Sequence, residues 1–398
     1  MATLRYRYRL YPTEVQRSAL ARTFGCVRVV WNDALARDRR DGIGYDGFAA
    51  ASRRLTAAKK TECRAWLREV SSVPTQQSLR TLDTAYRRFF DGLKGKGPRC
   101  GPPAWKRKDG RQAAEFTRSG FSLKCGKLRL AKIGHVSVRW SRALPSEPKT
   151  ATVTVDPAGR YHVSFTVEKM EQPLTGGEPV GIDLGITAFA ALSTGALVAA
   201  PDYSGLERRI AKAQRVLARR QKGSKRRARA KCRVAVLHAK IGDTRHDFLH
   251  KLSTRLVREH SMIALEDLNV SGMVKNHHLA RAISHQGWRA LRNMLEDKAA
   301  RHGRDLRVVD RWEPTSQVCS ECGHRWGKLG LEVRTIRCER CGVVHDRDVN
   351  AARNIVAAGL AETQNGRGER VRRAVPSGTG ATLGEASTTG AVPGISVL

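Results

Sequence analysis

The sequence contains no uninterrupted apolar run of about 18 residues, the length that a helix needs to cross a bilayer. Its first residues, Met-Ala-Thr-Leu-Arg-Tyr-Arg, also lack the apolar core of a signal peptide. Acidic side chains are scarce as well, because 37 Asp and Glu stand against 73 Lys and Arg. We therefore expect neither a membrane-spanning nor an exported protein, but a cytoplasmic one that associates with the nucleoid.

The resulting formal net charge of +36 is too large to serve solubility alone and calls for a polyanionic partner. Nucleic acid is the first candidate, and an anionic membrane surface is the alternative. The chain of 398 residues exceeds what one hydrophobic core usually serves, so we expect two to four structural units. Residues 361–398 are dominated by small and polar residues without periodicity, which predicts a disordered tail.

Cysteine is unevenly distributed along the chain. Five cysteines are isolated, and in a reducing compartment we interpret them as plain thiols: Cys26, Cys63, Cys100, Cys125 and Cys232. The others form two Cys-x-x-Cys pairs separated by 15 residues, the spacing of a zinc ribbon: Cys319, Cys322, Cys338 and Cys341. Because four thiolates leave no open position for water, we predict one structural Zn²⁺. His324 and His345 are the alternative ligands.

Three stretches that lie far apart in the sequence carry a carboxylate at one end. Asp183 and Glu266 each close a short apolar run, which indicates two buried strands that deliver an acid at the tip. Asp348 precedes an Ala-rich segment and is expected in the first turn of a helix. Carboxylate oxygens bind hard cations such as Mg²⁺, and two such ions can stabilise the attacking and leaving oxygens of a scissile phosphate.

Together the three acids predict a two-metal nuclease site. Any one of them alone is better interpreted as an ordinary cap of a strand or helix. Asp346 lies two residues before Asp348 and is the alternative ligand by chain geometry. Cys341 lies seven residues before Asp348, so we expect the zinc ribbon to brace the loop that carries this acid.

The N-terminal part predicts a strand followed by a helical bundle. Residues 4–10 alternate apolar or aromatic side chains with Arg, which predicts a half-buried strand with a cationic face. Its Tyr6 and Tyr8 could stack on bases, although strand aromatics more often pack within the sheet. Apolar residues at spacings of three and four predict the first helix: Leu20, Phe24, Val27, Trp31 and Leu35. Further helical patterns complete the bundle, at 45–54, 60–70 and 75–93.

A Lys-, Gly- and Pro-rich segment at 93–108 then predicts a phosphate-facing loop. The pattern becomes β-type from residue 116, with runs at 127–130, 136–140, 150–155 and 161–167. The opening strand is expected to join this sheet, so that the helices form an insertion.

The second half predicts an α/β order around the two acid-bearing strands. It adds a hairpin, a helix and a strand, at 190–200, 287–302 and 306–309. A basic helical stretch at 204–260 carries 18 Lys and Arg against 4 acids. Such a run is often only a solvated face, but the one-signed excess here favours contact with nucleic acid.

In this order the motifs point to a family. The chain resembles the TnpB proteins, transposon-encoded relatives of the type V CRISPR nucleases that are also called OrfB-type transposases. The resemblance covers roughly residues 4 to 360 and rests on the cysteine pairs and on five segments: Tyr11-Pro12-Thr13-Glu14-Val15-Gln16, Gly181-Ile182-Asp183-Leu184-Gly185, Leu265-Glu266-Asp267-Leu268, Thr315-Ser316-Gln317, and Asp346-Arg347-Asp348 continuing to Ile355.

The resemblance implies a multidomain α/β and β-barrel architecture. It implies an RNase H-like (RuvC) nuclease domain with an inserted zinc ribbon, and an N-terminal β-barrel wedge that is interrupted by a helical recognition bundle. The implied boundaries are 1–12 and 96–172 for the wedge, 13–95 for the recognition bundle, 173–314 and 346–360 for the nuclease domain, 315–345 for the ribbon and 361–398 for the tail.

The resemblance also implies RNA-guided, Mg²⁺-dependent cleavage of DNA beside a short transposon-adjacent motif. Asp183, Glu266 and Asp348 match the family's metal-binding acids, with Asp183 shared by two ions. The implied partners are a transposon-encoded guide RNA and target double-stranded DNA, held by a monomer with no membrane. The candidate nucleic-acid contacts are basic residues of the first strand, the first helix, the loop and the basic stretch: Arg5, Arg7, Arg17, Arg22, Arg28, Lys94, Lys96, Lys106, Arg107, Lys222, Lys225, Arg226 and Arg227.

Two other functions stay open. A guided DNA-binding repressor would act by occupancy without catalysis, although such relatives lose one or more of the three acids. A transposase would use the same metals to join DNA strands, although nothing in the sequence resembles a dimeric module that reads terminal repeats.

Overall fold

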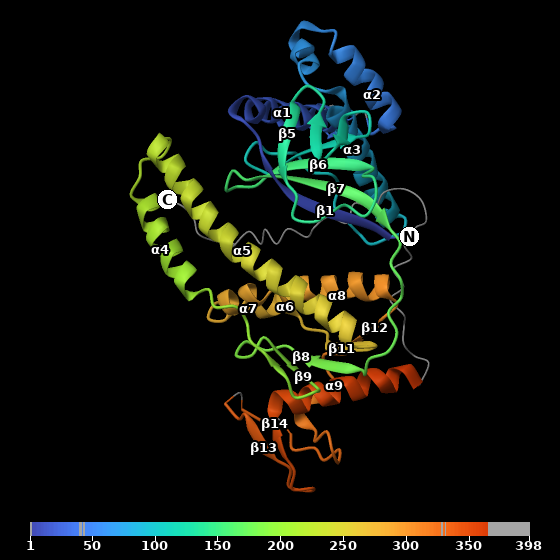
Figure 1. Ribbon diagram of the computed structural model, residues 1–398, viewed down its shortest axis with the longest axis vertical. Helices are drawn as coiled ribbons and strands as arrows, with labels where there is room; N and C mark the ends of the chain where they lie inside the picture. Colours follow the sequence, from blue (N-terminus) through green and yellow to red (C-terminus); the bar gives the residue numbers. More distant parts are fainter. Residues whose placement is uncertain (1, 40–41, 43, 328, 331, 365–398) are drawn as a thin grey trace. The chain divides into compact units, whose positions relative to one another are not determined.

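The computed structural model describes residues 2–39, 42, 44–327, 329–330 and 332–364 of the chain. The chain divides into two compact units, one of residues 1–170 and 210–239 and the other of 171–209 and 240–398 (Figure 1). Residues 210–239, which the sequence places inside the 173–314 domain, thus group with the N-terminal unit. In the described ranges, no helix is both long enough and apolar enough for a membrane crossing.

The first unit contains a seven-stranded antiparallel sheet with the order β2-β6-β7-β1-β5-β4-β3. Its strands are β1 (Ala2–Tyr11), β2 (Gln112–Thr117), β3 (Phe121–Lys124), β4 (Lys127–Leu130), β5 (Gly134–Arg139), β6 (Thr150–Val155) and β7 (Tyr161–Lys169). β1 lies between β7 and β5 (Figure 1), so the opening strand joins the sheet as predicted. The four β-type runs that were predicted from the sequence did not include the two edge strands, β2 and β3. Among the described residues, β2 and β3 do not pair with each other. The sheet is therefore open, and its hydrogen bonds do not close the barrel that the resemblance implies.

Alternation along β1 explains how it serves the core of this unit. Tyr8 and Leu10 are buried in an apolar cluster, while the preceding Arg7 is exposed. The Tyr8 ring lies 4.8 Å from the Trp140 ring and 5.9 Å from the Phe165 ring, measured between centroids. Tyr8 therefore packs within the sheet and has no free face for a nucleobase.

The helical insertion consists of α1 (Glu14–Arg39), α2 (Gly47–Ala58), a 3₁₀ helix (Glu62–Arg68) and α3 (Ser72–Leu93). The five apolar residues that predicted α1 are all buried. They divide their contacts, because Leu20, Phe24 and Val27 pack on the sheet while Trp31 and Leu35 pack on α3. The predicted helix at 60–70 was wrong in type, since this segment forms the tighter 3₁₀ helix.

The basic stretch at 204–260 was predicted as one helical run and is two helices, α4 (Ser204–Ala218) and α5 (Lys225–Glu259). The break contains Gly223, whose φ of +84° lies in the left-handed region. The Arg227 guanidinium closes the end of α4 by donating to the carbonyls of Leu217 at 3.0 Å and Arg220 at 2.8 Å. Lys222 thus lies in a turn, and Lys225 and Arg226 lie at the start of α5.

The second unit is a five-stranded sheet with the order β10-β9-β8-β11-β12. Its strands are β8 (Val180–Asp183), β9 (Ala190–Leu192), β10 (Leu197–Val198), β11 (Met262–Glu266) and β12 (Asp305–Val309). β8, β11 and β12 run parallel, while β9 and β10 run antiparallel to their neighbours. The parallel strands end at the same edge of the sheet, which brings the two acid-bearing tips together.

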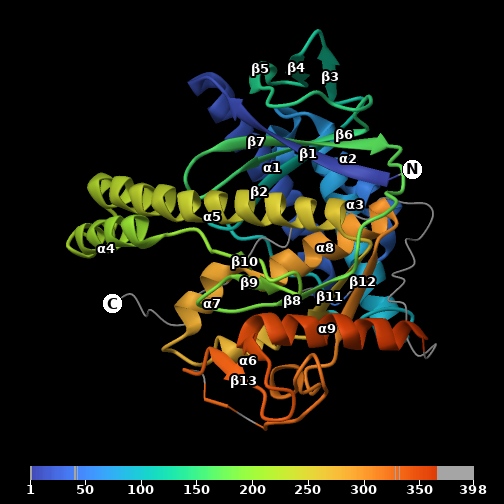
Figure 2. The same ribbon diagram turned by 60° about the horizontal axis from the view of Figure 1, so that its bottom comes forward.

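Helices cover both faces of this sheet. Val180, Ile182, Ile263 and Leu265 face an apolar core built by α5, α7 (Ala280–Gln286) and α8 (Trp288–His302). On the other face, Met262 and Ala264 pack with Ile355 of α9 (Arg347–Gln364). Figure 2 shows α9 running along β8, β11 and β12. α9 continues to residue 364, beyond the predicted start of the tail at 361, and residues 365–398 lie outside the described ranges.

The segment between β12 and α9 holds both cysteine pairs. It contains a short 3₁₀ helix (Thr315–Gln317) and a two-stranded sheet of β13 (Thr335–Arg337) and β14 (Val344–Asp346). β14 leads directly into α9, so the ribbon delivers the chain to Asp348.

Candidate active site and metal centre

Strand alternation places the three predicted acids around one edge of the second sheet. Side chains two residues apart share a face, so Asp183 lies on the face of Gly181, and Glu266 on the face of Ala264. That is the face covered by α9, whose first turn carries Asp348. The parallel register pairs Leu265 with Ile182, so Glu266, the last residue of β11, lies at the level of Asp183.

A glycine allows the helix to approach the strand closely enough for this meeting. A Cβ placed on Gly181 would lie 2.0 Å from the Ala352 carbonyl oxygen and 2.7 Å from the Val356 nitrogen, both in α9. Any side chain at 181 would therefore push α9 away from β8. The family motif Gly-x-Asp thus combines a contact surface for the helix with an acid two residues later.

The electrostatics of Asp183 reflect this convergence. Burial, together with the negative charges of Glu266 and Asp348, raises the pKa of Asp183 to about 7. The Arg347 guanidinium and the Leu184 N–H oppose this shift without cancelling it. The three carboxylates therefore share one electrostatic environment, in which a cation would relieve their mutual repulsion.

Two residues outside the predicted site form hydrogen bonds with Glu266 and Asp348. The Thr315 hydroxyl donates to Glu266 Oε1. The Arg334 guanidinium donates to Asp348 Oδ2 and to the Thr187 hydroxyl, each at 3.1 Å. Thr315 belongs to one of the family segments, and this was the only feature of the sequence that could have indicated its role. Arg334 lies in the ribbon, where no sequence pattern indicated a contact with Asp348.

The structure separates the two candidate acids at the start of α9. Asp346 is exposed, and its Oδ1 accepts hydrogen bonds from the N–H groups of Asp348 at 3.1 Å and Val349 at 2.9 Å. This is the geometry of a helix N-cap. Asp348 instead lies among the charges that act on Asp183. Asp346 has a structural role, and Asp348 is the acid that faces the cluster.

The adjacent Asp267 is engaged elsewhere. It accepts from Arg292 at 2.7 Å and from Arg311, and these two hydrogen bonds lower the pKa of its carboxyl group. Asp267 is therefore held as a paired anion beside the cluster and anchors the loop that carries Arg311.

The four cysteines form a compact cluster whose donor atoms fit zinc. Their Sγ atoms all lie within 4.8 Å of one another, and among the described residues no other group of three or more His, Cys, Asp or Glu is as compact. Cys319 and Cys341 are 3.8 Å apart, and Cys322 and Cys338 are 3.6 Å apart, sulfur to sulfur. A tetrahedral ion with Zn–S bonds of about 2.3 Å requires sulfur atoms about 3.8 Å apart.

The knuckles that present these sulfur atoms have the backbone expected of zinc ribbons. Gly323 and Gly342 have φ values of +71° and +74°, and their N–H groups donate to the carbonyls of Cys319 and Cys338. Neither His324 nor His345 is part of the cluster. His345 is buried, and its Nε2 lies 3.1 Å from Cys319 Sγ, so it packs behind a sulfur atom.

Two asparagines of α9 tie the ribbon to the helix that carries Asp348. The buried Asn350 accepts from the Ser320 N–H at 2.9 Å and donates to the Val318 carbonyl at 2.8 Å. Asn354 donates to the carbonyls of Thr315 and Val318, both at 2.7 Å. These bonds fix the first cysteine knuckle against α9, in agreement with the expected bracing by the ribbon.

The candidate nucleic-acid contacts fall into two groups. Lys94, Lys96, Lys222, Lys225 and Arg226 are exposed and form no ion pair within the described part of the chain. Others already have partners in the protein: Arg17 with Glu14, Arg22 with Glu69, Arg107 with Asp109, Arg227 with carbonyls, and Lys106, whose Nζ lies 3.9 Å above the Trp31 ring. Arg28 is half-buried, as is Arg5 on β1 beside the exposed Arg7.

Lys106 is held by several contacts that a phosphate would have to replace. Its loop is pinned to α1 by Asn32, which exchanges two hydrogen bonds of 2.9 and 3.0 Å with the Lys106 backbone. Burial lowers the pKa of the Lys106 ammonium to about 8. This side chain anchors the loop, and its predicted contact with phosphate would require it to leave the Trp31 ring.

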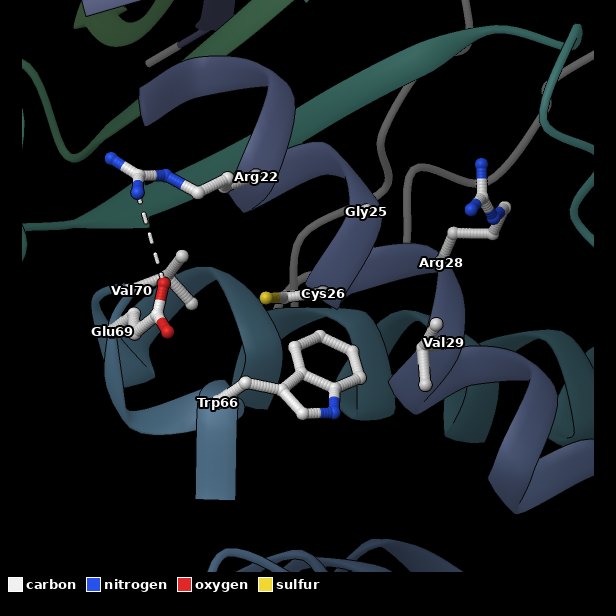
Figure 3. Close-up of a pocket in the computed structure, with 8 residues that line it drawn as sticks. All are labelled: Arg22, Gly25, Cys26, Arg28, Val29, Trp66, Glu69 and Val70. Carbon is white, nitrogen blue, oxygen red and sulfur yellow. Dashed lines mark ion pairs between the residues drawn. The ribbon is translucent and has the colours of Figure 1, made fainter. Parts of the chain in front are cut away.

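A cavity of about 260 Å³ opens in the helical insertion and is shown in Figure 3. The Trp66 indole and the Cys26 thiol form its apolar floor, with Arg22 and Arg28 on opposite sides. Burial raises the pKa of Cys26 to about 11, so this thiol stays protonated and is a poor nucleophile. The cavity belongs to the first unit, whereas the three acids belong to the second.

Three family models match the chain. The OrfB_IS605 model, described as "Probable transposase", matches residues 162–277 and includes Asp183 and Glu266. The model described as "Cas12f1-like, TNB domain" matches residues 288–355 and includes the cysteine pairs and Asp348. A model described as "Helix-turn-helix domain" matches residues 1–41, where the described residues form β1 and α1.

Curated relatives match over nearly their whole length. A protein of Streptomyces pristinaespiralis named "Putative RNA-guided DNA endonuclease" is 50% identical over 376 residues, covering 92% of this chain and 92% of its own. One of Escherichia coli K12 named "Putative RNA-guided DNA endonuclease InsQ" is 31% identical over 380 residues, covering 89% and 92%.

A solved structure shares the fold. The chain superposes on the protein of the "Cryo-EM structure of the Cas12f1-sgRNA-target DNA complex" with a TM-score of 0.53 and 13% sequence identity, covering 89% of this chain and 98% of that one. The fold is therefore Cas12-like. Since the family models match in the expected order and a relative is 50% identical across 92% of the chain, this protein belongs to the TnpB (OrfB-type) family.

Proposed function

We propose that the protein is an RNA-guided, Mg²⁺-dependent DNA endonuclease that cuts target DNA beside a short transposon-adjacent motif. The observation that carries the proposal is the convergence of Asp183, Glu266 and Asp348. Burial, and after it the negative charges of the other two acids, raise the pKa of Asp183 to about 7. The names of the two relatives support the guided activity, and the OrfB-type family supports the link to a transposon.

The proposed catalytic domain is RNase H-like, of the RuvC type. Its support is the mixed sheet with the order β10-β9-β8-β11-β12, in which the central strand and its parallel neighbour end on acids. We assign residues 173–314 and 346–360 to this domain and 315–345 to the inserted ribbon, with 1–12 and 96–172 as the wedge around the 13–95 recognition bundle.

In this proposal the three acids supply oxygen ligands for two Mg²⁺ ions. Bound magnesium would lower the pKa of water and neutralise charge on the phosphate oxygens. Asp183, on which the charges of the other two acids act, would ligate both ions, while Glu266 and Asp348 would each complete one side. The Thr315 hydroxyl holds the Glu266 carboxylate, and Arg334 compensates the charge of Asp348 until a cation replaces it.

The partners follow from charge and family. A net charge of +36 suits a guide RNA and its DNA target, whose heteroduplex is held through its backbone. The exposed, unpaired Lys94, Lys96, Lys222, Lys225 and Arg226 are the proposed phosphate contacts that require no rearrangement. We propose a monomer with one RNA.

The experiment starts by purifying the protein from cells that carry its native locus and sequencing the bound RNA. We expect one discrete transcript whose 3′ end runs into variable flanking sequence. That sequence defines a target, which the purified complex should cleave with Mg²⁺, and Asp183→Ala should abolish cleavage but retain guided DNA binding.

The same experiment separates the other functions. A heterogeneous mixture of cellular RNA would contradict a guided enzyme. Guided binding without cleavage by the unaltered protein would identify a repressor. Joined DNA strands in the presence of a free donor end would identify a transposase, the activity printed for the OrfB_IS605 model.

A further inference from the structure

The most exposed large apolar side chain in the described ranges is Trp312, at 83% of its full accessibility. Four other tryptophans use their indole N–H to bond backbone carbonyls: Trp31, Trp66, Trp140 and Trp326. Trp312 forms no such bond among the described residues. Single exposed apolar side chains are common on protein surfaces, so the argument rests on where this indole lies relative to the acids and not on its exposure alone.

The backbone that carries Trp312 is nevertheless firmly held. The Trp312 N–H donates to Asp310 Oδ1 at 2.9 Å, and the Glu313 N–H donates to the Asp310 carbonyl at 3.1 Å. This compact turn follows β12 directly. The indole is therefore presented to solvent by a fixed turn, which lowers the entropy lost when a ligand stacks on it.

Both sides of the turn are fastened to the acid cluster. On one side, Arg311 binds Asp267, the residue after Glu266. On the other, Thr315 donates its hydroxyl to Glu266 itself. Trp312 and Thr315 are three residues apart, at most about 11 Å of chain. The backbone that carries the indole therefore lies within about 11 Å of Thr315, the residue that contacts Glu266.

We propose that Trp312 is a substrate-positioning residue that stacks on an unpaired base of the DNA strand being cut, next to the scissile phosphate. Bases within a duplex already stack on both faces, so an indole in water selects an unpaired one. The stacked base would fix the strand at the acids. The proposal rests on the proposed nuclease function and deepens it, by naming a residue of this chain that would hold the strand at the site.

The test compares Trp312→Ala and Trp312→Phe in guided cleavage. Loss of one base–aromatic stack should slow cleavage by Trp312→Ala about 10- to 100-fold, with guided binding of the target unchanged, and Trp312→Phe should recover most of the rate. Leu197→Ala removes another exposed apolar side chain of the same unit and should cleave at the normal rate. A structural defect would instead lower thermal stability and would not be repaired by Phe.

A direct readout uses target DNA with 5-iodouracil at successive positions around the cut, bound to the Asp183→Ala protein and irradiated. We expect crosslinks to the peptide that contains Trp312, and their loss in Asp183→Ala/Trp312→Ala. Crosslinks only to other peptides, or cleavage by Trp312→Ala at the normal rate, would overturn the stacking role and leave the proposed function standing. Failure of the unaltered protein to cleave any guided target would overturn both.

Discussion

The second unit contains two clusters of side chains that we propose as metal sites, and they are built in opposite ways. The four sulfur atoms are already as close as one ion requires, and three of the four cysteines are at least partly buried. The three acids are spread over two strands and a helix, are coupled by charge, and are partly compensated by Arg334 and Thr315. The cysteine cluster is a closed site, in which the protein would fill every ligand position of the metal. The acid cluster is an open site, in which positions would remain for water or substrate.

This difference follows from the chemistry of the ligands. Four thiolates saturate zinc and leave nothing to bind a substrate, so the ribbon can only shape its surroundings. Carboxylates around magnesium leave positions for water and phosphate oxygens. The hydrogen bonds from Asn350 and Asn354 connect the two, because they hold the zinc knuckle to the helix that begins at Asp348.

The largest expected effect compares the two acids at the start of α9. Asp348→Asn should reduce guided cleavage at least about a thousandfold, because it removes the charge of a proposed metal ligand. Asp346→Asn keeps an oxygen that can cap the helix and should stay within about threefold of the normal rate. Single-turnover cleavage with Mg²⁺ measures both. Equal losses would show that the helix start, and not the Asp348 carboxylate, is what matters.

The next effect tests whether the cysteine cluster acts on the acid cluster only by holding the ribbon against α9. Cys338→Ser should release zinc and free the ribbon from α9. Cleavage should fall by about a hundredfold or more, which exceeds the loss usually seen when a hydrogen-bond partner of a metal ligand is removed. Cys63→Ser, an exposed thiol outside the cluster, should change nothing. Zinc content, limited proteolysis and cleavage are measured together. Full activity in a zinc-free Cys338→Ser protein would refute the bracing role.

A smaller effect is expected from forcing the strand and the helix apart. Gly181→Ala places a methyl group against the Ala352 carbonyl and should cost about 1–3 kcal/mol of stability, with cleavage reduced about tenfold as Asp348 moves from Asp183. Gly242→Ala, in open space within α5, should stabilise by about 0.5–1 kcal/mol. Urea unfolding compares the two, and a neutral Gly181→Ala would contradict the close contact.

The last expected effect is a pH dependence, which is measured on stability alone and not on cleavage. Because the folded-state pKa of Asp183 is raised to about 7, the folded protein holds this proton more tightly than the unfolded chain, and stability falls as the pH rises from about 4 through 7. Without added magnesium, Asp183→Asn should therefore exceed the unaltered protein in unfolding free energy by about 4 kcal/mol at pH 8 and by less than half of that at pH 5. Adding Mg²⁺ should stabilise only the unaltered protein. Identical pH profiles would contradict the shift.

Sequence alone located the acids because each follows or precedes a strong local pattern. Apolar runs gave the strands before Asp183 and Glu266, and an Ala-rich segment gave the helix after Asp348. The cysteine spacing gave the cluster directly. The family resemblance chose Asp348 over Asp346, and the N-cap hydrogen bonds of Asp346 supply the physical reason.

The rest depended on contacts that no local pattern records. Arg334 meets Asp348 only because the ribbon folds back on α9, and Lys106 meets Trp31 only through the loop. The break between α4 and α5 was missed because basic side chains flank it on both sides, although Gly223 marked it. The strand β2 was missed because its partner, β6, lies far along the chain.

The measurement that tests the account most directly counts metal ions in the complex with guide RNA and uncleaved target. Zinc is measured by mass spectrometry, and Mn²⁺, as a spectroscopic substitute for Mg²⁺, by electron paramagnetic resonance. We predict one zinc and two manganese ions for the unaltered protein, with manganese but not zinc lost in Asp183→Asn, and zinc lost in Cys338→Ser. Unchanged manganese binding in Asp183→Asn would contradict the assignment of the acids as the open metal site.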